Sequence, residues 1–249
     1  DTPVFMPIGT SGAVKTLLPQ ELYDVNTAII LGNTYHLFLR PGHDLIHRTG
    51  GLHKFMNWGK SILTDSGGFQ VYSLAKLNKI SDEGVKFQSH LDGSSHFITP
   101  EISMEIQLSL GADIIMAFDV CPPGEATKET VISAVDQTTK WIKRCKDYLD
   151  SSQAPYNWNQ TMFPIIQGGI YPELRKNSVE EMVPYSTCGI GIGGLAVGED
   201  KMAMFENIAM LDELLPEDQP RYLMGVGRPT DLVRAVQNGM DMFDCVLPT

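Results

Sequence analysis

Cysteine is scarce in this chain. Its 249 residues contain four cysteines, which lie far apart at positions 121, 145, 188 and 245, and no two of them form a C-x-x-C pair. This spacing argues against a disulfide framework and against a zinc knuckle within these residues. The pattern favours a reducing compartment, and we expect a cytoplasmic protein.

Long hydrophobic runs and an excess of basic residues are also missing. No apolar run approaches the roughly 18 residues of a membrane-spanning helix. No signal-like segment opens the chain, so we expect no membrane partner. Lys and Arg number 19 against 30 Asp and Glu, which gives a net charge of −11. This balance argues against a broad nucleic-acid-binding surface, although it allows a local basic site.

The chain does contain a series of short apolar, β-rich runs. Hydrophobic residues make up 43% of the sequence, an ordinary globular share that suits one large domain or two small ones. The runs are continuous and do not alternate with polar residues, which is typical of strands buried on both faces of a parallel sheet. We expect strands at residues 4–9, 28–33, 61–67, 113–119, 162–168, 189–195, 222–227 and 240–246.

Helical patterns fall between these runs. Residues 99–111 start with a capping Thr and a Pro and end at Gly, and residues 127–150 carry an apolar stripe. Strands that alternate with helices in this way predict a (β/α)8 TIM barrel, here a single domain over residues 1–249. A doubly wound sheet is the alternative. The long connections at 34–60 and 70–112 are interpreted as inserted segments.

Polar side chains stand near the C-terminal ends of five predicted strands, at Asn33, Asp65, Asp119, Gln167 and Asp244. Burying a carboxylate without a partner is costly, so each needs a structural partner or a function. In a barrel these strand ends meet at one mouth, which predicts a shared site. Two chemistries fit: metal-assisted hydrolysis, and substitution at a sugar carbon with one carboxylate as nucleophile and another as acid/base. The later strands lack histidines, which weakens the metal hypothesis.

Two glycine-rich segments are ambiguous. GIGIGG (189–194) matches a dinucleotide-binding pattern only formally, because such a site needs a helix at the third glycine. Its glycines indicate either room for a flat ligand or plain small-residue packing. MGVGRPTD (224–231) indicates either a phosphate site with Arg228 or an ordinary capped turn. The six histidines lie in or near the long loops and are interpreted as solvated or structural.

Nine segments carry a resemblance to a known family: FMPIGTSGAVK, ILGNTYHLFLRPG, ILTDSGGFQVYSL, SHLDGSSH, MAFDVCPP, IIQGG, GGLAVGE, YLMGVGRPTDLV and DMFDCVLPT. They cover nearly the whole chain in the family's order. The chain resembles the tRNA-guanine transglycosylases in their bacterial form. The resemblance implies a TIM barrel that exchanges guanine at the tRNA wobble position for 7-aminomethyl-7-deazaguanine, in queuosine biosynthesis. It implies a retaining double displacement on a flipped-out nucleotide, through a covalent ribosyl intermediate.

The resemblance also assigns roles to individual residues. Asp244 in DMFDC matches the nucleophile, and Asp65 in TDSGGFQ matches the general acid/base. Contacts to the base are implied for Asp119, Gln167, Gly194 and Leu195. The same pocket is lined by Asn33, Ser66, Gly67 and Gly68.

Other roles follow in the same way. Phe69 and Met224 match the pair that sandwiches the base, although the bacterial pattern usually has Tyr at position 69. Cys121 and Val197 match the bacterial pocket. Contact with RNA is implied for Gly225, Val226, Gly227, Arg228, Pro229, Thr230 and Asp231, and for Thr249, which matches the start of a basic segment.

The chain departs from the family's pattern chiefly by stopping. Full members continue into a site of three Cys and one His that binds zinc, and none of these ligands is present. We therefore expect zinc in the full-length protein with all of its ligands beyond Thr249, no metal ligand within these residues, and no organic cofactor. The resemblance also suggests a homodimer.

Three alternatives remain. A eukaryotic-type enzyme would insert the bulkier base queuine, but its pattern has Gly where this chain has Val197. A non-catalytic partner subunit would lack the catalytic carboxylates, whereas Asp65 and Asp244 are both present. A nucleotide-dependent oxidoreductase using GIGIGG lacks the predicted helix start.

Overall fold

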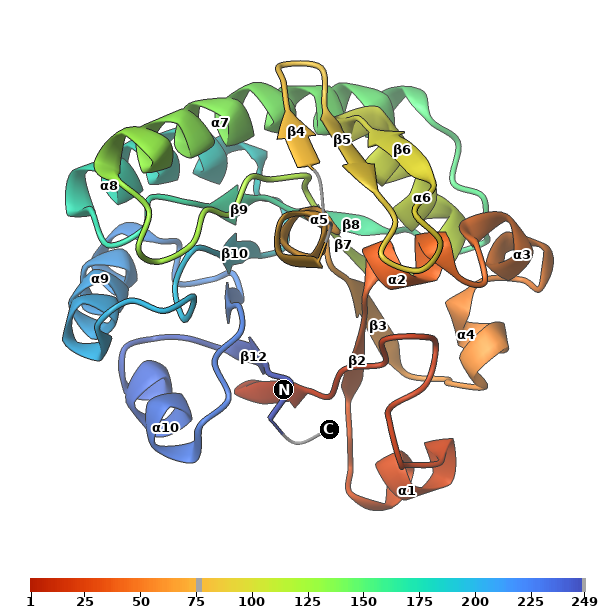
Figure 1. The fold of residues 1–249 in the computed structure, drawn as a ribbon. Coiled ribbons are helices and arrows are strands. Elements are labelled where there is room, and N and C mark those ends of the chain that lie inside the picture. The colour runs from red at the N-terminus through yellow and green to blue at the C-terminus, as the bar shows by residue number, and fades with distance from the viewer. Residues whose placement is uncertain (75–77, 248–249) are drawn as a thin grey trace.

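The structure is a closed ring of parallel strands surrounded by helices. The computed structural model describes residues 1–74 and 78–247. The ring strands are β1 (Val4–Met6), β2 (Ile29–Gly32), β3 (Ser61–Thr64), β7 (Ile114–Met116), β8 (Thr161–Phe163), β9 (Ile165–Ile166), β10 (Ile190–Ile192), β11 (Arg221–Leu223) and β12 (Met242–Asp244). Seven of these strands lie within the predicted runs, and β8 and β11 each begin one residue before the predicted run. In Figure 1 they encircle a common axis.

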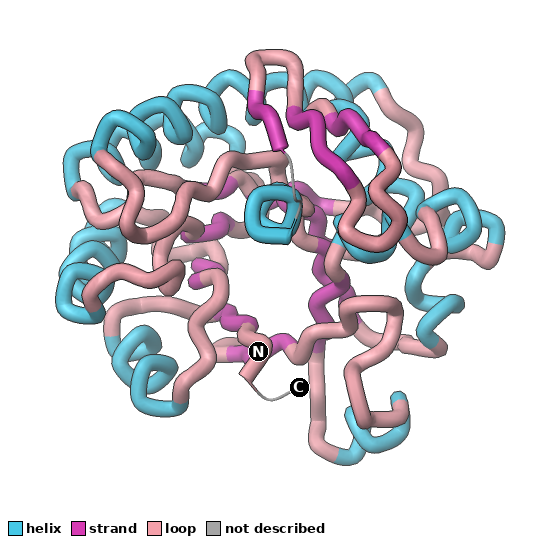
Figure 2. Tube along the Cα trace, viewed as in Figure 1, coloured by secondary structure: helices cyan, strands magenta, loops and turns pink. Residues whose placement is uncertain are grey.

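The ring closes at two junctions. Its hydrogen-bonded sheets run in the orders β1-β12-β11-β10-β9 and β2-β3-β7-β8. Only Pro164, which has no N–H to donate, separates β8 from β9. On the opposite side Ile8 forms a parallel bridge with Leu31. Figure 2 shows the strands inside and the helices outside. The predicted (β/α)8 barrel is therefore confirmed, and the doubly wound alternative is wrong.

Side chains along each strand alternate between two apolar layers. The outer layer contains strand residues such as Ile30, Ile62, Ile115 and Ile192, which pack together with residues of the outer helices. Both faces of the ring are thus buried, which explains the continuous hydrophobic runs. Each fully buried Ile or Leu contributes roughly 1.5–3 kcal/mol. The inside of the ring is filled by Met6, Ile8, Ile29, Leu31, Leu63, Met116, Phe163, Ile165, Tyr222 and Met242.

The outer helices follow the predicted capping signals. Thr99 accepts a hydrogen bond from the Ile102 N–H at the start of α6, and Gly111 ends that helix with φ of +74°. The apolar stripe predicted on α7 is buried at Val131 and Ile142. α6 (Pro100–Leu110) lies at the end of the second long connection. The described helices outside the long connections are α1 (Pro19–Asp24), α7 (Lys128–Ser151), α8 (Pro172–Met182), the 3-10 turn η1 (Val183–Tyr185), α9 (Lys201–Leu214) and α10 (Pro229–Gln237).

The two long connections carry the inserted elements that the sequence predicts. The first holds α2 (Thr34–Leu39), α3 (His43–Arg48) and α4 (Leu52–Met56), and the second begins with α5 (Gly68–Leu74). An antiparallel sheet follows, formed by β4 (Asn78–Ile80), β5 (Val85–Gln88) and β6 (Ser95–Ile98). The Tyr35 hydroxyl and His90 Nδ1 are hydrogen-bonded at 2.8 Å, which ties this sheet to α2. Among the described residues, no helix combines the length and apolar character that crossing a membrane requires.

Candidate active site

A cavity of about 420 Å³ opens at the C-terminal ends of the ring strands. Its size is typical of small-molecule sites, and active sites of TIM barrels lie at this end. The cavity is called the mouth pocket below. It is lined by Ile8, Thr10, Leu31, Asn33, His36, Asp65, Ser66, Phe69, Gln70, Ser73, Leu74, Asp119, Cys121, Gln167, Gly193, Gly194, Leu195, Ala196, Val197, Tyr222, Met224, Gly225, Asp244, Cys245 and Val246.

Asp65 follows β3 directly and is only 6% exposed. Burial raises the pKa of Asp65 to about 6, the charge of Asp244 adds to the rise, and the hydrogen-bond donors around the carboxylate oppose it. At pH 7 about one tenth of this carboxyl group therefore keeps its proton, and the fraction grows as pH falls toward 6. Both oxygens are engaged: Oδ1 accepts from Thr34 N (2.8 Å) and Gly67 N (3.2 Å), and Oδ2 accepts from Asn33 Nδ2 (2.6 Å) and Gln70 Nε2 (3.0 Å).

Asp244 ends β12 on the other side of the mouth pocket. Its Oδ1 accepts hydrogen bonds from the Tyr222 hydroxyl at 2.7 Å and from the Gly225 N–H at 2.8 Å. Burial raises the pKa of Asp244, and these two donors oppose the rise. Within residues 1–74 and 78–247, no donor is hydrogen-bonded to Asp244 Oδ2.

The two carboxylates thus differ in a way that matters for chemistry. Asp65 is held through both oxygens and has a raised pKa, whereas Asp244 is anchored through Oδ1, and no donor among the described residues is hydrogen-bonded to its Oδ2. An anchored carboxylate with one open oxygen suits nucleophilic attack, and a carboxylic acid with a raised pKa suits proton transfer. Together they can carry out a double displacement at a sugar carbon.

Asp119 forms a second polar cluster deeper in the mouth pocket. Its Oδ1 accepts from Ser66 Oγ at 2.7 Å, and its Oδ2 accepts from Gln167 Nε2 at 2.7 Å. Burial raises the pKa of Asp119, and both donors oppose the rise. Gln167 Oε1 is buried and has no hydrogen-bond partner in the described part of the chain. A flat heterocycle with both donors and acceptors on its edge would fit these groups.

The loop after β10 forms one wall. Gly193, Gly194, Leu195 and Val197 all line the mouth pocket. A side chain at Gly194 would collide with the Gln167 amide, and φ at Gly194 is +64°. Close packing, one of the two roles that the sequence left open, is therefore confirmed for Gly194, and access for a flat ligand stays a prediction.

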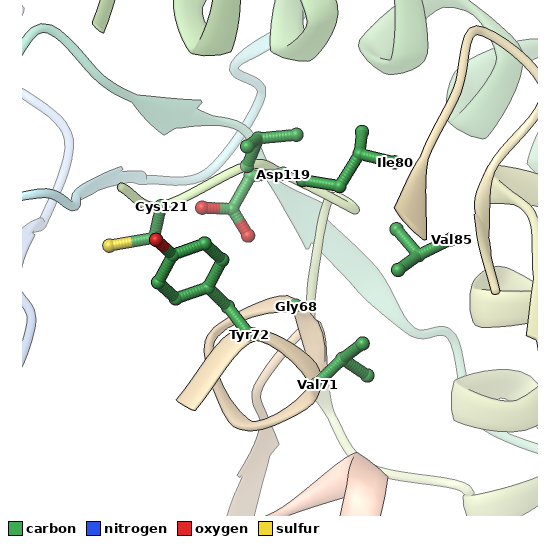
Figure 3. A pocket seen from close by; sticks show the side chains of 8 residues that line it. Gly68, Val71, Tyr72, Ile80, Val85, Asp119 and Cys121 are labelled. Atoms are coloured by element: carbon green, nitrogen blue, oxygen red, sulfur yellow. The ribbon is translucent and has the colours of Figure 1, made fainter. Parts of the chain in front are cut away.

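Cys121 lies beside this wall. Burial raises the pKa of its thiol to about 12, the charge of Asp119 adds to the rise, and the nearby Gly194 N–H opposes it. The thiol is therefore neutral at physiological pH and is no nucleophile in this structure. Figure 3 shows Cys121 near Asp119 and Tyr72, around a second and much smaller cavity of about 10 Å³. That cavity has room for about one water molecule.

Phe69 and Met224 both line the mouth pocket, and Phe69 is 46% exposed. Gly67 and Gly68 do not line it directly. Their N–H groups donate to Asp65 Oδ1 and to Ser66 Oγ, so they act on the pocket through these side chains. A side chain at Gly68 would lie 2.5 Å from the Asp119 carbonyl oxygen, which explains the glycine there.

The loop from Gly225 to Asp231 runs from β11 into α10, beside Asp244. Arg228 is the residue before the first turn of α10, and Val226 is buried. The Asp231 carboxylate forms an ion pair with Lys201 Nζ at 2.7 Å. The predicted RNA-contacting loop therefore borders the mouth pocket. Thr249 lies outside the described residues.

A family model described as queuine tRNA-ribosyltransferase matches residues 1–249. The chain belongs to the queuine tRNA-ribosyltransferase family. It is 54% identical to the queuine tRNA-ribosyltransferase of Desulforamulus reducens, over 100% of this chain and 66% of that protein. It is 55% identical to that of Halothermothrix orenii, over 100% of this chain and 65% of the relative. The chain thus spans slightly less than two thirds of the length of the curated relatives it matches.

Within this family frame, the structure brings together most of the residues that the sequence singles out. The dinucleotide hypothesis for GIGIGG is wrong, since β10 ends at Ile192 and the next helix, α9, begins only at Lys201. The residues that line the mouth pocket as predicted are Asn33, Asp65, Ser66, Phe69, Asp119, Cys121, Gln167, Gly194, Leu195, Val197, Met224, Gly225 and Asp244.

Sequence reasoning misses several residues that line the mouth pocket, and four of them matter for the chemistry: Tyr222, Gln70, Cys245 and His36. All four lie within segments that carry the family resemblance, which is the one signal that points to them. Alternation along the last strand predicts that Cys245 faces away from Asp244; this is wrong, because β12 ends at Asp244 and Cys245 lines the mouth pocket. The expectation that His36 is solvated or structural leaves out its place in the pocket lining.

No group of three or more His, Cys, Asp or Glu among the described residues could hold a metal ion. These residues therefore do not fit a zinc site. The expected zinc stays a prediction about the full-length protein.

Proposed function

We propose that the protein is a tRNA-guanine transglycosylase of bacterial type, with this barrel as its catalytic part. It exchanges guanine at the tRNA wobble position for 7-aminomethyl-7-deazaguanine. The observation that carries the proposal is the pair of unlike carboxylates, Asp65 and Asp244, facing one cavity of suitable size. Membership in the queuine tRNA-ribosyltransferase family supports it.

In the first displacement, Asp244 Oδ2 attacks C1′ of the ribose. The bond from C1′ to the base nitrogen breaks, and its electron pair leaves with guanine. Asp65 in its acid form donates a proton to the departing base. The product is a covalent ribosyl ester of Asp244, formed through an oxocarbenium-like transition state.

The second displacement reverses these roles. The incoming 7-deazaguanine gives its ring N–H proton to Asp65 as the nitrogen attacks C1′. The ester bond breaks, and Asp244 regains its carboxylate. Two inversions leave the configuration at C1′ unchanged. The Tyr222 hydroxyl and the Gly225 N–H hold Asp244 in place for both steps, because an attacking oxygen should start roughly 3–3.5 Å from its target.

We assign recognition of the base to the part of the mouth pocket around Asp119 and Gln167. Asp119 can accept from the amino group and ring N–H of guanine, and Gln167 can turn its amide toward the carbonyl edge. Phe69 and Met224 lie at the pocket and can cover the two faces of the ring. A base can reach this depth only if it leaves the anticodon stack, so the reaction requires base flipping.

Selectivity between bases is assigned to Val197, with Cys121 on the neighbouring wall. Both line the mouth pocket, and the isopropyl group of Val197 occupies volume that a larger 7-substituent would need. This favours 7-aminomethyl-7-deazaguanine over queuine. For the RNA we assign contact to the loop Gly225–Asp231, in which Arg228 supplies a cation. From the family resemblance we also propose a homodimer with zinc bound outside these residues.

The test is exchange of labelled guanine into tRNA by the full-length protein. We expect exchange with a tRNA carrying guanine at the wobble position and none with a matched tRNA carrying adenine there. Binding of tRNA without any exchange would instead indicate a non-catalytic subunit. Insertion of queuine at a rate equal to that of the aminomethyl base would indicate the eukaryotic-type activity.

A further inference from the structure

Arg175, on α8, is a fully buried arginine at 0% exposure. Arg144 and Arg221 are also buried or half-buried, and they form ion pairs with Glu101 and Asp212. Arg175 forms no ion pair with any Asp or Glu that the structure describes. A buried cation without a carboxylate partner is costly, so its position calls for a reason.

The guanidinium donates hydrogen bonds to backbone carbonyl oxygens at the ends of two adjacent strands. Nε donates to Gly169 O at 2.8 Å, and Nη1 donates to Gly193 O at 2.8 Å and, more weakly, to Ile166 O at 3.4 Å. Nη2 donates to Gly194 O at 3.1 Å. Arg175 therefore links the turn after β9 to the glycine loop after β10, directly behind the wall of the mouth pocket.

These contacts determine where two peptide N–H groups point. In a trans peptide the C=O and the following N–H point in opposite directions. Because the Gly193 and Gly194 carbonyls face Arg175, the N–H groups of Gly194 and Leu195 face away from it, toward the pocket. Gly194 and Leu195 both line the mouth pocket, and the Gly194 N–H lies near enough to the Cys121 sulfur to lower the pKa of that thiol.

The surrounding residues are adapted to this arrangement. Gly168 has no side chain, and a Cβ there would lie 2.8 Å from the Arg175 N atom and 2.9 Å from its Cγ. Ser178, one turn further along α8, is fully buried and accepts from the Gln167 N–H at 3.1 Å. α8 thus positions both of the strand ends that carry Gln167 and Gly194.

We propose that Arg175 is a positioning residue that aims the Gly194 and Leu195 N–H groups at the carbonyl oxygen of the bound base. The positive charge behind both peptides polarises them and strengthens their N–H groups as donors. Arg175 touches no substrate itself. This inference rests on the proposed function, because it presumes that the mouth pocket binds guanine.

The test compares two ligands that differ at the carbonyl edge. Free guanine has the carbonyl oxygen and a ring N1–H, and 2-aminopurine lacks both. Because Asp119, to which the N1–H is assigned, is the same in every variant, the change that a variant causes in the ratio of dissociation constants reports on the N–H pair. With the full-length protein, Arg175→Met should lower the preference for guanine over 2-aminopurine by about tenfold, roughly the worth of one hydrogen bond. A purely structural role would weaken both ligands alike and leave the ratio unchanged.

Arg221 provides the matched control. It is 4% exposed and also donates to backbone carbonyls, those of Leu215 and Pro216. Arg221 comes directly before Tyr222, but its side chain contacts these residues that precede β11 and does not line the mouth pocket. Arg221→Met should lower the thermal midpoint and leave the ligand ratio unchanged. Arg175→Lys, which keeps the charge but not the planar fork, should give an intermediate ratio. If Arg175→Met does not fold, the ligand ratio of Arg175→Lys is the test.

The outcomes separate the two proposals. An unchanged ratio in a folded Arg175 variant, with guanine bound normally by the unmutated protein, would overturn this inference alone. Failure of the unmutated protein to bind guanine at all would overturn the proposed function and this inference with it. An equal change of ratio in the Arg221 variant would show that the effect is not specific to the pocket, and would also overturn the inference.

Discussion

Replacing Asp65 by Asn should make the stability of the protein less dependent on pH. The pKa of Asp65 is about 6 in the folded protein, against an ordinary value of 3.8, and burial is the largest cause. The folded state therefore binds this proton more tightly than the unfolded chain does. The corresponding stability is fully present below pH 3.8 and is lost as pH rises through about 6. A gap of about two pH units corresponds to about 3 kcal/mol.

Asp65→Asn removes this ionisation and keeps the shape of the side chain. The new amide N–H needs an acceptor, and the Asn33 and Gln70 amides can turn to present one. Gln70 Oε1 is at present buried without a partner within the described ranges. We therefore expect the variant to fold. Relative to the unmutated protein, it should gain up to about 3 kcal/mol between pH 4 and pH 8.

Urea unfolding of both proteins at pH 4 and pH 8 measures this gain. Asp113 is a suitable control. Burial alone would raise its pKa, but hydrogen bonds from His53 and the Ile62 N–H bring the pKa below its usual value. A lowered pKa contributes stability above the unfolded value of 3.8, so this contribution is already present at pH 4. Asp113→Asn should therefore lower stability at both pH values, unlike Asp65→Asn. The reasoning is refuted if the stability difference between the Asp65 variant and the unmutated protein is the same at both pH values, or changes in the opposite direction.

Three further predictions concern the pocket. Tyr222→Phe removes the hydroxyl that donates to Asp244 at 2.7 Å, and a hydrogen bond to a charged group is worth roughly 1.5–3 kcal/mol. Single-turnover formation of the tRNA adduct should slow by roughly 10- to 100-fold, and an unchanged rate would contradict the anchoring role. Asp119→Asn turns one acceptor into a donor and should weaken guanine binding by roughly 1–3 kcal/mol per mismatched group, which calorimetry measures; an unchanged affinity would contradict base recognition. Val197→Gly should admit bases with a larger 7-substituent, since removing an isopropyl group frees volume. Steady-state exchange with both bases tests this, and continued rejection of the larger base would place selectivity elsewhere.

Much of the barrel could be predicted because its signals are local. Continuous apolar runs mark strands buried on both faces, and Thr99 and Gly111 mark the ends of one helix. The site residues at the strand ends could be predicted for a related reason. Asp65 and Asp244 interrupt apolar segments, and a parallel barrel brings all such ends to one mouth.

The contacts that tune these groups could not be predicted. Tyr222 anchors Asp244 only because the closed ring places β11 beside β12. Arg175 lies in PELRKNSVEEM, where its neighbours Lys176 and Glu180 are exposed, so nothing in the spacing distinguishes it from a surface arginine. Its burial follows from the packing of α8 on two strand ends. Family resemblance predicts which residues react, whereas the hydrogen-bond partners of these residues required the three-dimensional structure.

The central claim is that Asp244 is the nucleophile and Asp65 the acid/base. A denaturing gel of the full-length protein mixed with tRNA and a guanine analogue tests it most directly, because a covalent adduct survives denaturation. Asp244→Ala should fold, bind tRNA and form no adduct. Asp65→Asn keeps the nucleophile and should still form an adduct, although slowly. An adduct that persists in Asp244→Ala and vanishes in Asp65→Asn would contradict the account and reverse the two roles.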